Sequence, residues 1–501
     1  MSDLKKDIGL LTLVALGVGG MVGSGIFALP AAMAAVAGPG LIIAIIITGL
    51  MATFLAIAYA ELGAAFPVSG GPYALPRLAM GDLAGFIMGW GYFFYLFIGT
   101  AAIIDIFVVY LGYYIPGLAV GETLTWTGTL IAVAFLWLFT IINVFGVKWG
   151  GIYAVVTTIA KLLALLVFGI IGLAFGLVFH RPEGLLPLAP YGLSGITIAV
   201  TLFFWSFTGF EAIILPTGEV KDPERNVPLA MILTMLITIV VYVFVAFVFV
   251  AMVGSGWEKL GLAVGNWKGL ENMGSPLAQV SGALGLLWLA AIATLGGLIA
   301  TGGAGGDWVL LQARLPYAMA EDKLFMPVMS KINKFGTPAV ALIFTSVLTT
   351  AVMLSVRQFP SVALMASVAA ILPYAAAALS VPILRKTRPE VNRPFKLPFP
   401  VLTTAAGFVF ATLLIYWATW PWTLVGTILL FLGYPAFLFV RRNNFEFSRN
   451  AWIPVYMIGL TIFSYLGYRH LIFMPFDIMV LIVFALIIFS WAYFANIKGR
   501  Q

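Results

Sequence analysis

Charged residues, cysteine and histidine are what this sequence has least of. Of its 501 residues only 9% are charged, none is cysteine and two are histidine, whereas about a quarter of a soluble domain is charged. The lack of cysteine excludes disulfides, thiolate chemistry and cysteine-ligated metals. His180 and His470 stand apart at the ends of apolar runs. We therefore expect no metal site and no cofactor.

What the sequence has in abundance is apolar length. Hydrophobic residues make up 62% of the chain, more than a water-soluble fold can bury, and runs of about 20 residues match the bilayer's hydrocarbon thickness. We predict an all-α membrane protein and, because residues 1–7 are short and polar, no cleavable signal peptide. The fourteen predicted spans are 10–36, 41–66, 83–115, 126–146, 150–179, 196–217, 229–254, 283–313, 338–356, 361–384, 401–420, 422–441, 451–468 and 473–496.

The basic residues predict the orientation of these spans. If the N-terminus is inside, the cytoplasmic loops and tails hold 20 of the 26 Lys and Arg residues, the opposite loops hold five, and Lys161 lies within a span. Cytoplasmic loops carry this excess of positive charge, so we expect both termini in the cytoplasm and the protein in the cell membrane. The net charge of +7 is scattered over many loops and indicates topology, not nucleic-acid binding.

Two predicted spans carry small and polar residues at mid-depth. The first contains Gly23-Ser24-Gly25, and the sixth contains Thr208-Gly209. Unpaired backbone in lipid costs several kcal/mol, so a helix unwinds there only where it lines a cavity or binds something. The two spans are five apart, as inverted repeats of spans 1–5 and 6–10 would place them, and matching interrupted helices indicate a transporter's binding site. Packing against neighbouring helices is the alternative role for such glycines.

A series of short motifs surrounds these breaks. In chain order they are Gly23-Ser24-Gly25-Ile26-Phe27, Ala60-Glu61-Leu62, Phe66-Pro67, Gly70-Gly71-Pro72-Tyr73, Phe207-Thr208-Gly209-Phe210-Glu211, the run from Gly218 to Pro228, Ala320-Glu321-Asp322 and Gly336-Thr337-Pro338. Together they resemble the amino acid–polyamine–organocation superfamily over about residues 8–440. The resemblance implies a LeuT-type fold, with the inverted-repeat transport core in residues 1–400 and four additional helices in residues 401–501. It also implies a secondary active transporter of amino acids that works by alternating access.

The resemblance also implies a substrate site at the two breaks. The N–H groups of Ser24, Gly25 and Ile26 would bind a carboxylate at the positive end of a half-helix. Gly20 replaces an asparagine of the arginine-type antiporters, which argues against the same arginine-like substrate. The other implied site residues are Gly23 and Gly209 at the breaks, Met21, Val22, Phe207 and Thr208 as carbonyl acceptors for an ammonium, Trp205 as a gate, and Trp308 and Thr100 as side-chain contacts. For Trp205 and Trp308 a lipid-facing or interfacial position is the alternative.

Charged residues inside spans are functional by default, because each costs a few kcal/mol to insert. Lys161 lies ~16–20 Å into the fifth span at 1.5 Å per residue, and by resemblance its ammonium stands where sodium-coupled relatives bind Na⁺. We predict proton coupling through Lys161, with a permanently charged structural role as the alternative. Asp105 and Asp307 are open between binding a cationic substrate, pairing with Lys161 and lining a wet cavity. Glu211 is expected at the cytoplasmic gate.

Several other functions compete with proton-coupled uptake. An amino acid exchanger, a polyamine or cationic amino acid transporter, a sodium-coupled carrier and a non-transporting nutrient receptor of the same fold all remain open. A membrane enzyme is disfavoured because the two histidines are isolated, and a channel is disfavoured by the paired broken helices. The expected partners are an amino acid as small-molecule substrate and the lipid bilayer, without nucleic acid. The side-chain preference and the oligomeric state stay open.

Overall fold

The computed structural model describes most of the chain. The described residues are 8–66, 70–145, 150–179, 182–214, 217, 220–418, 420–440 and 447–498. Pro67, His180, Gly218 and Glu219, which the sequence singled out, lie outside them.

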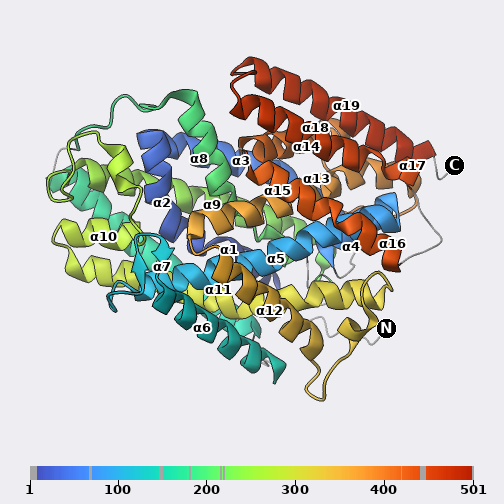
Figure 1. Ribbon diagram of the computed structural model, residues 1–501, viewed down its shortest axis with the longest axis horizontal. Coiled ribbons are helices and arrows are strands. Elements are labelled where there is room, and N and C mark those ends of the chain that lie inside the picture. Colours follow the sequence, from blue (N-terminus) through green and yellow to red (C-terminus); the bar gives the residue numbers. More distant parts are fainter. Residues whose placement is uncertain are drawn as a thin grey trace.

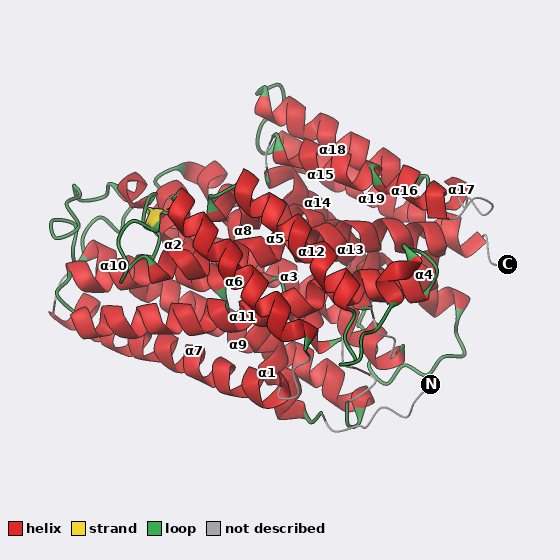
Figure 2. Ribbon diagram, turned by 60° about the horizontal axis from the view of Figure 1, so that its bottom comes forward, coloured by secondary structure: helices red, strands yellow, loops and turns green. Residues whose placement is uncertain are grey.

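Helices make up most of the described part, as predicted for an all-α membrane protein (Figures 1 and 2). Before residue 180 the long helices are α1 (Leu10–Met21), α2 (Ser24–Ala37), α3 (Leu41–Ala65), α4 (Gly71–Met80), α5 (Asp82–Leu111), α6 (Trp126–Val144) and α7 (Gly150–Leu173), which continues as a wider turn over Ala174–Phe179. From there to residue 400 they are α8 (Gly192–Phe207), α9 (Pro223–Gly254), α10 (Pro276–Ala283), α11 (Leu287–Glu321), α12 (Ala339–Ser355) and α13 (Phe359–Thr387). The C-terminal helices are α14 (Pro400–Trp417), α15 (Trp422–Phe431), α16 (Gly433–Val440), α17 (Phe447–Asn450), α18 (Trp452–Tyr468) and α19 (Phe476–Lys498).

Short elements join these helices. A two-stranded antiparallel hairpin, β1 (Ala119–Val120) and β2 (Thr123–Leu124), connects α5 to α6. Tight helical turns occupy η1 (Gly38–Gly40), η3 (Phe210–Ile213), η5 (Trp267–Leu270) and η6 (Pro327–Ser330).

The membrane spans follow the predicted series. In the described residues, twelve helical stretches are long and apolar enough to cross a bilayer, and the first of them, Leu10–Ala65, holds both α1–α2 and α3. The apolar helix α12 is shorter, at Ala339–Ser355. Counting α1–α2 and α3 as two spans and adding α12 gives the fourteen predicted segments. The boundaries differ from the predicted ones by several residues. The eighth span, for example, was predicted at 283–313, whereas α11 runs from Leu287 to Glu321.

Both predicted helix breaks are present. Between α1 and α2, Val22 and Gly23 leave helical geometry, with ψ of 89° and −138°. After α8, Thr208 is extended and Gly209 has a φ of +103°, a conformation that glycine adopts without steric cost. The regular helix of the sixth span therefore ends at Phe207, at the predicted break.

The helix contacts show a regular pairing. Each of the helices α3, α5 and α6 packs against the helix five spans later, which is α9, α11 and α12 respectively. The broken helices pair in the same way, α2 against α8 and α1 against η3. Other contacts have counterparts too, since α5 packs on α13 as α11 packs on α7. The C-terminal helices α18 and α19 lie at one edge of this bundle (Figures 1 and 2).

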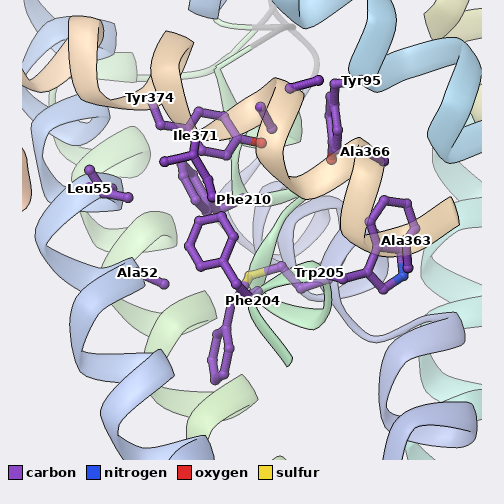
Figure 3. Close-up of a cluster of buried hydrophobic side chains, with 14 of the residues drawn as sticks. Ala52, Leu55, Tyr95, Phe204, Trp205, Phe210, Ala363, Ala366, Ile371 and Tyr374 are labelled. Atoms are coloured by element: carbon purple, nitrogen blue, oxygen red, sulfur yellow. The ribbon is translucent and has the colours of Figure 1, made fainter. Parts of the chain in front are cut away.

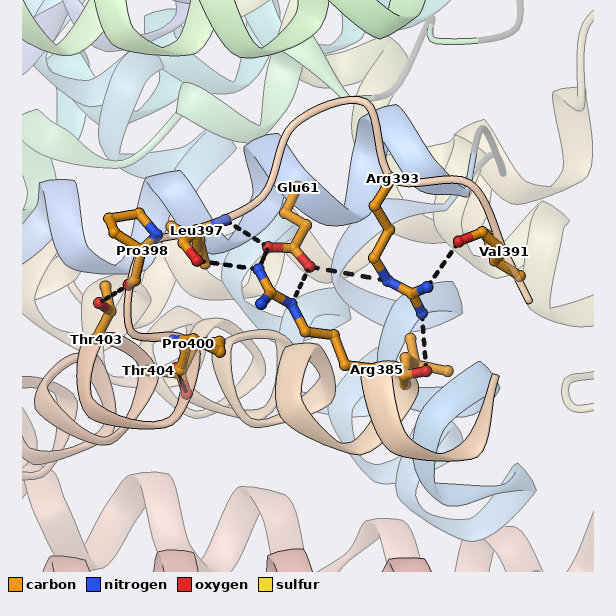
Figure 4. A network of polar contacts seen from close by, with 10 residues as sticks. Glu61, Arg385, Val391, Arg393, Leu397, Pro398, Pro400, Thr403 and Thr404 are labelled. Atoms are coloured by element: carbon orange, nitrogen blue, oxygen red, sulfur yellow. Dashed lines mark hydrogen bonds and ion pairs between the residues drawn. The ribbon is translucent and has the colours of Figure 1, made fainter. Parts of the chain in front are cut away.

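A buried ion pair fastens α3 to the end of α13 (Figure 4). Glu61 on α3 is 1% exposed and receives two hydrogen bonds from Arg385, Nε to Oε1 at 2.7 Å and Nη2 to Oε2 at 2.6 Å. Arg393 lies 3.9 Å from Oε1, and the backbone N–H of Leu397 donates to Oε2 at 2.8 Å. Because every one of these partners satisfies the buried carboxylate, the loop after α13 is held against α3.

Candidate binding site at the two helix breaks

The two breaks touch each other through glycine backbone. A methyl group added at Gly20 would lie 2.8 Å from the carbonyl oxygen of Gly209, and one at Gly209 would lie 2.5 Å from the carbonyl oxygen of Gly20. No larger side chain fits at either position without moving the backbone. The unwound segments of the first and sixth spans are therefore parts of one site.

Backbone donors at the start of α2 face this site. The first N–H groups of a helix have no partner within the helix, and the N-cap Gly23 has no side chain to bind them. Ser24, Gly25 and Ile26, the predicted donors, are all buried. A methyl at Gly25 would lie 1.9 Å from Oγ of Ser206. The structure thus brings the predicted donors of the first span against the sixth.

The predicted carbonyl acceptors differ in whether a protein group already binds them. Tyr242 on α9 donates to the carbonyl oxygen of Met21 at 2.6 Å and lies 2.9 Å from that of Ser206, so its hydroxyl bridges the two breaks. Met21 thus already has a protein donor. The Phe207 ring packs against Phe203 and Tyr242, so only the backbone of Phe207 is directed to the site. Thr208 donates its hydroxyl to the carbonyl oxygen of Trp205 at 2.7 Å.

Aromatic side chains gather at the breaks, and Figure 3 shows Tyr95, Trp205 and Phe210 in one buried cluster. The indole N–H of Trp205 donates to Oγ of Ser24 at 2.9 Å. The Trp205 ring lies 5.7 Å from that of Trp308, and Tyr95 meets both in edge contacts at 6.2 and 5.1 Å. Both tryptophans are buried, at 4% and 6% exposure, which excludes the lipid-facing alternative. Gly99 makes room for them, because a methyl there would lie 2.5 Å from the Trp308 ring.

A carboxylate closes the other side of the site. Glu211, 3% exposed, accepts hydrogen bonds at Oε1 from the hydroxyls of Tyr92 at 2.9 Å and Tyr374 at 2.7 Å. Its Oε2 accepts from the backbone N–H of Gly209 at 3.0 Å. The carboxylate therefore joins α5 and α13 to the break after α8.

A cavity lies next to this closure. Its volume is about 380 Å³, and Tyr92, Leu96, Arg314 and Tyr317 are among the residues that line it. Tyr92 thus belongs to both the cavity wall and the hydrogen-bonded group around Glu211. We call this cavity the vestibule.

Lys161 binds the last turns of α1. Its ammonium, on a side chain 3% exposed overall, donates to the carbonyl oxygen of Gly19 at 2.6 Å. One turn away, the hydroxyl of Thr158 donates to the carbonyl oxygen of Ala15 at 3.1 Å. The C-terminal end of a helix carries partial negative charge, so the ammonium stabilises α1 just before its break.

The remaining predicted residues differ in their surroundings. Asp105 is 1% exposed, and neither of its carboxylate oxygens has a hydrogen-bond partner within the described residues. Asp307 is exposed on α11, within electrostatic reach of Lys161 and Arg314. Thr100 is fully buried and donates its hydroxyl to the carbonyl of Leu96 in its own helix. The three roles considered for the two aspartates stay predictions.

The sequence did not indicate four residues that help to build the site. Tyr92, Tyr95 and Gly99 share one face of α5 at the spacing of three and four residues, and this polar stripe in an apolar span was an available signal. Tyr374, on α13, had no comparable local signal.

These features define a class of protein. A polytopic α-helical membrane protein whose two interrupted helices meet around buried backbone groups is built like a membrane transporter. The chain belongs to the amino acid permease family, whose model matches residues 8–463.

Similar proteins agree with this assignment. The chain is 28% identical to an aspartate-proton symporter of Bacillus subtilis (strain 168), over 99% of this chain and 97% of the relative. It is 26% identical to the glutamate/serine transporter AimA of the same organism, over 98% and 94%. It is 27% identical to that organism's branched-chain amino acid permease BcaP, over 86% and 93%.

Proposed function

We propose that this protein carries an amino acid across the cell membrane by alternating access, with the substrate bound between the two helix breaks. The contact between Gly20 and Gly209 carries this proposal, because it joins the donors of one interrupted helix to the acceptors of the other in a single buried site. An amino acid presents a carboxylate and an ammonium, and free backbone N–H and carbonyl groups suit both without a charged side chain.

The surrounding residues then have distinct roles. The N–H groups of Ser24, Gly25 and Ile26 bind the carboxylate, and the carbonyls at the breaks bind the ammonium. Trp205 and Trp308 cover the bound side chain. The hydrogen bonds of Glu211 close the path to the vestibule.

The helix pairing supports a two-repeat core. In the first four spans of the core each helix packs against the helix five spans later, which is a pattern that two inverted repeats in residues 1–400 produce. Residues 401–501 add the peripheral helices. Alternating access then moves one repeat against the other around the breaks. The excess of basic residues on one side supports cytoplasmic termini.

The side-chain preference of the substrate stays open. The relatives are named for aspartate, for glutamate and serine, and for branched-chain amino acids, so similarity at this level does not select one of them. The aromatic cover of Trp205, Trp308 and Tyr95 supports a substrate whose side chain has apolar surface.

We further propose that transport is coupled to protons through Lys161. Its ammonium binds α1 directly before the break, where gain or loss of a proton changes how firmly the first span is held. Sodium is disfavoured because the ammonium takes the place of the cation. No cofactor is needed for this cycle. The alternative is an amino acid exchanger in which Lys161 stays charged throughout.

A binding screen followed by a transport assay tests this function. Purified protein is heated with each of the twenty amino acids and with polyamines, and a ligand that raises the unfolding temperature is then offered to proteoliposomes. We expect uptake that rises with an inward proton gradient and ignores sodium. Uptake that requires internal amino acid but ignores the gradient would identify an exchanger. Binding without any flux would identify a receptor.

A further inference from the structure

An apolar groove lies on the surface of the helix bundle beside α5. Its volume is about 400 Å³, and every residue that lines it is apolar. On α5 the lining consists of Phe86, Trp90, Phe93, Phe94 and Phe97, which lie on one face of the helix. The other walls come from α12, α16 and the segment after α11. This groove, which we call the α5 groove, is separate from the vestibule, which contacts another face of α5.

Ring contacts hold the walls of the α5 groove in place. Phe325 lies 6.4 Å from Trp90 and 5.8 Å from Phe93, and Phe344 of α12 stacks on Phe93 at 6.3 Å. The indole N–H of Trp90 is already used, because it donates to the carbonyl of Leu429 at 2.9 Å. The α5 groove is therefore already formed and apolar before anything binds in it.

The length of the groove matches one leaflet of a bilayer. From Phe86 to Phe97 the helix rises ~16 Å at 1.5 Å per residue, about half of the ~30 Å hydrocarbon core. Because α5 begins at Asp82, the groove starts near one end of the span and stops near its middle. An acyl chain of a phospholipid occupies this same depth.

A basic residue lies at the outer end of the groove. Lys323, two residues before the groove-lining Phe325, is exposed. The neighbouring Asp322 is paired with Arg77 and so does not offset Lys323. Basic residues at the membrane surface attract anionic lipid headgroups.

We propose that the α5 groove binds one acyl chain of an anionic phospholipid, with its headgroup at Lys323. In the orientation proposed above, this lipid belongs to the cytoplasmic leaflet. The bound chain fills the space between α5, α12 and α16, and α5 also carries Tyr92 of the Glu211 group. The lipid thus stabilises the helix that separates the groove from the vestibule. The binding itself does not depend on which substrate is transported.

Native mass spectrometry of the full chain in detergent tests this proposal directly. The protein is titrated with phosphatidylglycerol, phosphatidylcholine or a sterol, and retained lipid is counted. Ala436 lines the groove on α16, so Ala436→Trp fills it. We expect this variant to bind phosphatidylglycerol about tenfold more weakly than the unmodified protein, as loss of buried acyl methylenes predicts.

Two further variants separate the chain contact from the headgroup contact. Leu438 is on the same helix and 47% exposed, but it does not line the groove, so Leu438→Trp is the matched control and should bind normally. Lys323→Asn suits the positive φ at that position and should remove the preference for phosphatidylglycerol over phosphatidylcholine while leaving phosphatidylcholine binding unchanged.

Three results would overturn the proposal. Equal phosphatidylglycerol binding by the unmodified protein and Ala436→Trp would place the lipid elsewhere. Retention of the sterol in place of phospholipid would assign the groove to a sterol. A dimer that Ala436→Trp abolishes would make the groove a contact between two copies of the chain. None of these measurements requires transport, so failure of the proposed function leaves the test intact.

Discussion

The ammonium of Lys161 donates a hydrogen bond to the carbonyl oxygen of Gly19 at 2.6 Å, two residues before α1 ends at Met21. This contact joins α7 to the first helix break. It gives the lysine a direct means to change the position of α1.

Replacing Lys161 tests its role in coupling. Lys161→Ala should retain substrate binding but lose the response of uptake to a pH gradient, because no group remains to carry the proton at α1. Lys161→Arg should bind substrate and fail to complete the cycle, since arginine does not deprotonate. Proteoliposome uptake with imposed pH gradients measures both. A normal gradient response in Lys161→Ala would leave the lysine as a structural contact.

The carboxylate donors are tested at Gly25. Gly25→Val should abolish substrate binding, because even a methyl group meets Oγ of Ser206 and a valine crowds the N–H groups around it. Ser24→Ala should be mild, since it removes only the hydrogen bond from Trp205, about 1 kcal/mol. Ligand-induced thermal shift and isothermal titration distinguish the two. Unchanged affinity in a folded Gly25→Val protein would place the substrate elsewhere.

The tyrosines that bind Glu211 provide a test of the closure toward the vestibule. In the double variant Tyr92→Phe and Tyr374→Phe, both hydroxyl donors to Oε1 are lost, and each such bond to a charged group contributes about 1.5–3 kcal/mol. Preloaded amino acid should leave proteoliposomes that contain the double variant faster than it leaves proteoliposomes that contain the unmodified protein. Tyr456→Phe is the control, because Tyr456 is buried among the C-terminal helices beside Thr412. Equal efflux rates in all three proteins would show that the hydrogen bonds of Glu211 do not close the path to the vestibule.

Much of the site was predictable because its signals are local. Gly23-Ser24-Gly25 and Thr208-Gly209 interrupt apolar helices in the sequence itself, and both breaks are present. The partners of Glu211 were not predictable, because Tyr92 and Tyr374 are 119 and 163 residues away along the chain. The hydroxyl of Tyr242 that occupies the Met21 carbonyl is 221 residues away. Such contacts follow from how the helices pair, which hydrophobic periodicity alone does not specify.

The break in the sixth span was predicted at Thr208-Gly209, and the regular helix ends there, at Phe207. The helix stops because Thr208 turns to extended backbone and donates its hydroxyl to Trp205 one turn back.

The ion pair between Glu61 and Arg385 should govern stability more than transport. Glu61→Gln leaves Arg385 and Arg393 without their carboxylate, and breaking a buried pair costs about 3–5 kcal/mol. We expect a clearly lower unfolding temperature in detergent. Glu258→Gln, at an exposed position, is the control and should unfold normally. An unchanged unfolding temperature in Glu61→Gln would show that the contacts in Figure 4 add nothing to stability.

The hairpin between α5 and α6 predicts how stability depends on pH. Glu122, in the turn between β1 and β2, is 5% exposed, and burial together with the charge of Glu271 raises its pKa to about 8. The folded protein therefore holds this proton more tightly than the unfolded chain does, whose glutamates have a pKa near 4.3. Between these two values the folded state binds more protons, so the free energy of unfolding falls as pH rises and levels off above about pH 8.

Removing the titrating group should flatten that profile. Glu122→Gln keeps the shape of the side chain and cannot ionise, so its unfolding temperature should change less between pH 5 and 8 than that of the unmodified protein. Glu271→Gln removes only the neighbouring charge, so the pKa of Glu122 in the folded protein should fall. The loss of stability should then be smaller and level off at a lower pH, because ionised Glu122 is no longer repelled. Thermal unfolding in a pH series measures all three proteins. Parallel profiles for Glu122→Gln and the unmodified protein would assign the pH dependence to other groups.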